Sequence, residues 1–246
     1  METAASVLRA THIVAAIASL LILGVPLAAR KGSRLHKRVG WVWVASMVVA
    51  IVTGTAISIL TLAWPAAMRP TVSPERARTF GLFLLLVGAM SASSIWQGIR
   101  AIGRKHAPAA SHHPVDIGLP ALTIAIATFV LALGLTRGSV LLSVFGVGAA
   151  LLTAGHLRFA WRPLPSKMAW WYGHMNGMLS AVIAAVTAFA VAGLQRFVTI
   201  PAALAFLPWI VPGVVLGPAL SIWQRYYRNR FEPAGGARDG RGRAPA

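Results

Sequence analysis

The sequence predicts an all-α integral membrane protein, a bundle of about seven transmembrane helices. Three observations support this prediction. Hydrophobic residues make up 57% of the 246 residues and charged residues only 11%, whereas a typical soluble domain carries about 25% charged residues. The apolar residues come in long blocks, each near the roughly 20 residues that a helix needs to cross a bilayer. Basic residues gather in alternate connections between these blocks, as membrane orientation requires.

Breaks in the apolar pattern separate the predicted spans. Pro65 follows the second block, Pro114 precedes the fourth, and Pro163 precedes the sixth. Proline interrupts helices because it lacks an N–H donor and clashes with the preceding turn. In chain order we expect spans at residues 7–29, 39–62, 79–101, 117–136, 139–159, 170–194 and 199–223.

The basic residues predict the orientation of the bundle. The connections after the first, third and fifth spans and the C-terminal segment hold five, three, three and six Lys or Arg, and the other side holds six in all. The richer side faces the cytoplasm, so we expect the N-terminus outside and the C-terminus in the cytoplasm. The net charge of +18 therefore indicates a bilayer with anionic lipids at the cytoplasmic face and not a nucleic acid.

The spans leave little room for a second domain. Residues 1–224 are predicted to form a single seven-helix transmembrane domain, and residues 225–246 a basic, disordered cytoplasmic tail. From Glu232 onward the tail is rich in Gly, Ala, Pro and Arg. Such a segment cannot bury enough apolar surface to offset the entropy of ordering.

Several kinds of chemistry have no support in the sequence. Cysteine is absent and only five residues are acidic, and all five acids lie in tails, loops or span ends. Proton-coupled carriers usually place a carboxylate within the bilayer, and hydrolases often need paired carboxylates. Neither a phosphate-binding Gly-rich motif nor a His-Glu-x-x-His zinc motif occurs. Whether the chain is an enzyme stays open.

Histidine is the remaining candidate for chemistry. His36 begins the second predicted span, His156 lies near the end of the fifth, and His174 lies just inside the sixth. The predicted topology places all three at similar depth near the cytoplasmic face. Imidazole binds haem iron, zinc and copper, so these residues are candidate ligands for haem b or a single metal ion. The alternative is that each histidine bonds headgroups, water or backbone.

Two other features leave different functions open. Polar side chains line the third span at Ser91, Ser93, Ser94 and Gln97, where they can form interhelical hydrogen bonds or part of a cavity. The seventh span contains four prolines, and broken helices often line transporter sites. The hypotheses are therefore an electron-transfer protein with haem b or a metal, a small-molecule carrier or binding protein, and a scaffold or assembly subunit without a cofactor.

Two segments resemble a known family. Residues 35–44 (LHKRVGWVWV) and 171–178 (WYGHMNGM) are similar to the His-containing segments of bacterial membrane proteins grouped as domain of unknown function 2306. The resemblance extends over residues 10–195 in layout and implies an uncharacterised multi-pass protein of the bacterial inner membrane. The family has no established activity. The family-like positions are His36, Gly40, His174, Met178 and Phe189, with His156 also in keeping.

Overall fold

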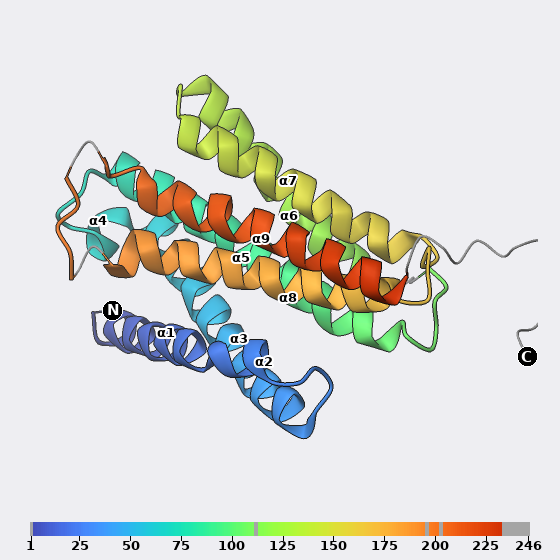
Figure 1. Ribbon diagram of the computed structural model, residues 1–246. Helices are drawn as coiled ribbons and strands as arrows, with labels where there is room; N and C mark the ends of the chain where they lie inside the picture. Colours follow the sequence, from blue (N-terminus) through green and yellow to red (C-terminus); the bar gives the residue numbers. More distant parts are fainter. Residues whose placement is uncertain (1, 111–112, 195–196, 202–203, 233–246) are drawn as a thin grey trace, which may run out of the picture.

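The computed structural model describes residues 2–110, 113–194, 197–201 and 204–232, and this part of the chain contains helices and no strand. Seven of its helical segments are long and apolar enough to cross a membrane (Figure 1), which confirms the all-α class and the seven spans. In chain order the elements are α1 (Glu2–Ile22), α2 (Gly24–Ala28), α3 (Arg34–Ala63), α4 (Pro65–Met68), α5 (Pro74–Gly103), α6 (Pro114–Thr136), α7 (Val140–Trp161), α8 (Ala169–Ala188), the π-helix η1 (Phe189–Gly193) and α9 (Leu207–Phe231). α1 with α2, and α8 with η1, each make one span.

Helix α5 is the centre of the bundle. It packs against α3 and α8 on one side and against α6 and α7 on the other. Helix α1 lies along α3, and α9 lies along α8 in the foreground of Figure 1. Side chains on α5 can therefore reach four neighbouring helices.

Serine and proline define several helix starts. The Ser33 hydroxyl accepts a hydrogen bond from the His36 backbone N–H at 3.2 Å, which caps α3 and places His36 in its first turn. Ser73 caps α5 in the same way, and Pro74 and Pro114 occupy the first turns of α5 and α6. Proline is tolerated there because the first N–H groups of a helix have no partner within it.

The last span differs from its predicted position. The sequence indicated residues 199–223, but α9 spans Leu207–Phe231. Pro208 in the first turn allows a helix to start there, and α9 runs on through Pro212 and Pro218 as one helix. The basic residues from Arg225 to Arg230, expected in a disordered tail, instead form the helix end. Residues 233–246 of that predicted tail lie outside the described residues.

The apolar residues are divided between two buried clusters and an exposed surface. One cluster joins α3, α5 and α8 at Trp43, Val44, Met47, Ile95, Ala181 and Val182. The other joins α5, α6 and α7 at Phe83, Leu86, Ala127, Val130, Leu142 and Ala149. Many large apolar side chains remain exposed, with Leu21 78% and Leu151 71% exposed. Apolar surface on this scale indicates contact with lipid.

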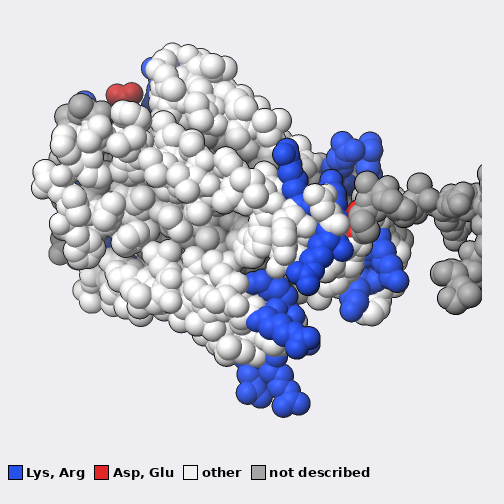
Figure 2. Space-filling model, viewed as in Figure 1, with Lys and Arg blue, Asp and Glu red and all other residues white. Residues whose placement is uncertain are grey.

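Lys and Arg side chains gather at one end of the face seen in Figure 2. This basic end holds the α2–α3 and α5–α6 connections, the α7–α8 connection and the end of α9. The alternation that predicted the orientation is thus present in the fold. Which end faces the cytoplasm stays a prediction.

Candidate functional site

The structure places all three predicted histidines toward the basic end of the bundle. His36 lies in the first turn of α3, His174 in the second turn of α8, and His156 in the last two turns of α7. Although all three lie toward the same end of the bundle, they do not form one cluster, because His156 lies on a different side of α5 from His36 and His174.

His36 and His174 face each other from α3 and α8. Their ring centroids are 6.4 Å apart, and the ring planes make an angle of 79°. His36 Nδ1 lies 3.0 Å from the carbonyl oxygen of Pro26, and His174 Nδ1 lies 2.9 Å from that of Gly98. Because a carbonyl only accepts, each Nδ1 carries the donated proton, and in the neutral form of either ring the lone pair is then on Nε2. The backbone therefore orients both rings as potential ligands.

A lysine and a tryptophan border this histidine pair. Lys31 donates to the carbonyl oxygens of Pro26 (3.0 Å) and Leu27 (2.6 Å), which lie at the end of α2. Its Nζ lies 5.4 Å from the ring centroid of Trp223 on α9, and the Pro26 carbonyl oxygen to which it donates also lies 3.0 Å from His36 Nδ1. Burial lowers the pKa of Lys31 below the usual lysine value.

His156 occupies a separate site. Its Nδ1 lies 2.9 Å from the hydroxyl oxygen of Ser93 on α5, and the residue is only 2% exposed. Ser93 and Gly98, which bind His156 and His174, are five residues apart, or about 140° around the helix. The two histidines therefore approach α5 from different sides.

A metal centre made by His36, His156 and His174 together is not formed. Among the described residues, no group of three or more His, Cys, Asp or Glu side chains is placed to hold a metal ion. The three histidines lie toward the same end of the bundle, as predicted, but their directions around the bundle differ. Only His36 and His174 are brought together.

Comparison of the chain with protein-family models, with curated proteins and with solved structures found no match. The resemblance to domain of unknown function 2306 therefore stays a prediction.

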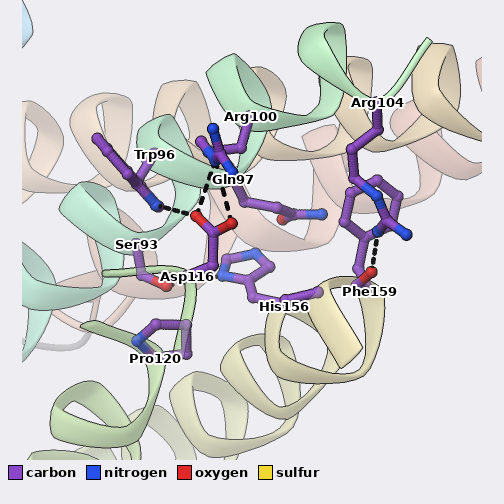
Figure 3. Close-up of a pocket in the computed structure, with 10 residues that line it drawn as sticks. Ser93, Trp96, Gln97, Arg100, Arg104, Asp116, Pro120, His156 and Phe159 are labelled. Atoms are coloured by element: carbon purple, nitrogen blue, oxygen red, sulfur yellow. Dashed lines mark hydrogen bonds and ion pairs between the residues drawn. The ribbon is translucent and has the colours of Figure 1, made fainter. Parts of the chain in front are cut away.

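A buried charged cluster lies beside His156, and sequence reasoning missed it. Asp116, in the first turn of α6, is 6% exposed, and both of its carboxylate oxygens accept from Arg100 Nε at 3.0 Å (Figure 3). Trp96 Nε1 donates to the same carboxylate at 2.6 Å. Trp96 and Arg100 are four residues apart on α5, so they share one face of the helix. The spacing of Trp96 and Arg100 could have indicated from the sequence that they share a face of α5. That this face packs against α6 is known only from the fold.

Arg104 lies at the basic end of the same region, directly after α5. Its guanidinium donates to the carbonyl oxygens of Ala109 at 2.8 Å and Arg162 at 2.6 Å, and also to that of Phe159. The guanidinium carbon lies 4.7 Å from the Phe159 ring centroid. Burial lowers the pKa of Arg104 from its usual value, and the nearby Asp116 carboxylate opposes that shift.

Two cavities meet this polar region. The smaller has a volume of about 20 Å³ and lies among α5, α6 and α7, where it touches Ser93, Asp116 and His156. The larger has a volume of about 490 Å³ and is bordered by α5, α7, α8 and α9. Gln97 and Phe159 line both cavities. The polar stripe of the third span thus provides an interhelical hydrogen bond at Ser93 and a cavity wall at Gln97.

Proposed function

We propose that the protein is a multi-pass electron-transfer protein of a bacterial inner membrane, in which His36 and His174 would hold one haem b. The facing imidazoles with backbone-bonded Nδ1 atoms carry this proposal. The proposal places the basic end at the cytoplasmic face, where its Lys and Arg contact anionic lipid headgroups.

The donor set of two imidazoles fits haem better than a bare zinc ion. Zinc in proteins takes three or four protein ligands, and no group of three suitable side chains is present among the described residues. A porphyrin supplies four of the six iron ligands, so two histidines complete the set. With a metal–nitrogen distance of about 2.0 Å, two imidazoles that held one metal ion between them would have ring centroids about 6 Å apart, and the centroids of His36 and His174 are 6.4 Å apart.

The surroundings of the pair also suit such a ligand. Trp43 follows His36 by seven residues and Ala181 follows His174 by seven, which is two helical turns on the same face. Both belong to the buried apolar cluster of α3, α5 and α8, so an apolar ring system on the histidines would meet apolar side chains. Lys31 borders the histidine pair, so its ammonium group would be placed to pair with a carboxylate group of a bound haem. Haem bound here would supply a one-electron redox centre.

The test is the absorption spectrum of the purified protein, expressed with ample haem, in oxidised and reduced forms with metal analysis. We expect a Soret band, sharp reduced α and β bands, and iron in a 1:1 ratio to protein. His36→Ala and His174→Ala should each lose these bands. His12→Ala is the matched control, because His12 Nδ1 also lies 2.9 Å from a backbone carbonyl oxygen, that of Ala50, without a facing histidine.

A fourth variant separates loss of a ligand from loss of the fold. His174→Met keeps a haem ligand, so it should retain haem with a raised reduction potential, as methionine ligation does. Protein that contains no haem, or that holds another metal in its place, would overturn the proposal. Haem that persists unchanged in both alanine variants would do so as well.

A further inference from the structure

The larger cavity has the size and lining of a small-molecule site. Its volume of about 490 Å³ falls within the range of about 300–1,000 Å³ that such sites occupy. Gly155, Phe159, Ala169 and Gly173 form an apolar wall from α7 and α8. A Cβ at Gly155 would meet no atom within 4 Å, whereas at Gly173 it would lie 2.5 Å from the Phe159 ring, so Phe159 packs against Gly173 and the open space lies beside Gly155.

Gln97 brings an unused hydrogen-bond acceptor to this cavity. The residue is 8% exposed, and its Oε1 atom is buried without a hydrogen-bond partner. Figure 3, which draws the lining of the smaller cavity, shows the Gln97 side chain extending from α5 toward Phe159, and both residues also line the larger cavity. Buried polar atoms are nearly always paired, and an exception indicates a role or a missing partner. Gln97 lines this cavity, so a donor bound there would supply a partner for this amide after a small shift of the side chain.

The opposite part of the cavity carries balanced charge. Arg228 and Glu232, at the end of α9, both line it. Asn176 and Gln224 join α8 to α9 through a side-chain hydrogen bond of 3.5 Å, and both border the same space. One positive and one negative side chain give little net attraction for an ion, so the lining favours a neutral guest.

We infer that this cavity binds a small, neutral, mainly apolar ring compound that carries a hydroxyl group, such as a phenol or a quinol headgroup. The hydroxyl donates to Gln97 Oε1, and the ring lies against the apolar wall near Phe159. The site differs from the His36–His174 pair and does not depend on haem there.

A pair of ring compounds tests the hydroxyl contact directly. Binding of 2-naphthol and of 2-methoxynaphthalene to the purified protein is measured by calorimetry, with empty micelles subtracted. The two have the same ring system, but only the first can donate a hydrogen bond. We expect 2-naphthol to bind about tenfold more tightly, which is the usual effect of one buried hydrogen bond. Gln97→Leu should remove this preference while the protein still elutes as a single folded species.

A second variant tests the place of binding without touching the acceptor. A side chain at Gly155 meets no atom within 4 Å of its Cβ, so Gly155→Leu fills the cavity and should weaken binding of both compounds at least tenfold. Gly148→Leu is the matched control, since Gly148 is on the same helix, seven residues earlier, and is equally open. That control should bind both compounds as the unmodified protein does.

Equal affinity of the unmodified protein for the two compounds would overturn the inference, because Gln97 would then be satisfied by water. A preference that survives Gln97→Leu would also overturn it. So would binding that Gly155→Leu and Gly148→Leu affect alike, since it would reflect the micelle and not the cavity.

Discussion

Asp116 on α6 and Arg100 on α5 form an ion pair in which the carboxylate is almost completely enclosed and the arginine is not. The side chain of Asp116 is 5% exposed and that of Arg100 is 40% exposed. Arg100 and Trp96 both stabilise this enclosed carboxylate, whereas the guanidinium also meets solvent. The pair joins the central helix to α6 at the basic end.

Removing this carboxylate should destabilise the fold. Asp116→Ala leaves Trp96 Nε1 and Arg100 without the acceptor that they share, and we expect a loss of about 1–3 kcal/mol in the free energy of unfolding. Thermal unfolding followed by tryptophan fluorescence measures the change. The control is Glu75→Ala, which removes the exposed ion pair of Glu75 with Arg137 and should change stability little. Equal changes in the unfolding temperature of Asp116→Ala and Glu75→Ala would show that burial of the Asp116 carboxylate does not strengthen its contribution to stability.

The close approach of α5 and α8 should not tolerate a methyl group at Gly177. A Cβ there would lie 2.5 Å from the Ser94 carbonyl oxygen and 2.6 Å from the Gly98 backbone nitrogen. Gly177→Ala must separate the two helices, with an expected cost of about 1–3 kcal/mol. In protein that carries the proposed haem, it should also weaken haem retention, because His174 bonds to Gly98 across the same contact.

Gly118→Ala provides the control for this packing effect. A Cβ at Gly118 meets no atom within 4 Å, and alanine favours helix over glycine by about 1 kcal/mol. This variant should be as stable as the unmodified protein or more so. A Gly177→Ala protein with unchanged unfolding temperature and haem content would show that the helices are not held at this distance.

Lys31 should make stability depend on alkaline pH. Burial lowers its pKa in the folded protein below the usual value of 10.5, so the folded state loses this proton before the unfolded state does. The unfolded state then binds more protons, and stability rises with pH between the two pKa values. Below the folded pKa, the cost of the buried charge is fully present and constant.

The unfolding temperature of the unmodified protein minus that of Lys31→Met should therefore increase as the pH approaches 10.5. The exposed Lys37 gives the control, because Lys37→Met should show no such trend. A difference that falls with pH would mean that the carbonyl oxygens of Pro26 and Leu27 hold the charged form of Lys31 more strongly than burial opposes it.

The orientation can be tested because the chain contains no cysteine. Thr71→Cys places a single thiol in the connection before α5, and Ala107→Cys places one in the connection after it; both positions are exposed. In spheroplasts, an impermeant maleimide should label the first directly and the second only after the membrane is permeabilised. The reverse pattern would invert the predicted topology.

Hydropathy was sufficient to predict the spans because each is a local property of about 20 residues. The predicted start of the last span was too early. The sequence is apolar from Pro201 through Pro208, and composition alone does not show at which of these prolines the helix begins. The direction of a side chain around a bundle depends on which helices are neighbours. For that reason His36 with His174, Ser93 with His156 and Asp116 with Arg100 were not predictable as pairs, although most of these residues were noticed singly.

The position of Arg104 has a consequence for the order in which the protein assembles during synthesis. Arg104 follows the third span, but two of its acceptors, the carbonyls of Phe159 and Arg162, belong to the end of the fifth span and the residue after it. The guanidinium cannot complete its hydrogen bonds until that span has been made and inserted. The contacts of Arg104 with the end of α7 therefore form late in biogenesis, and until then the nearby carbonyl of Ala109 together with water or lipid headgroups must accept from this guanidinium.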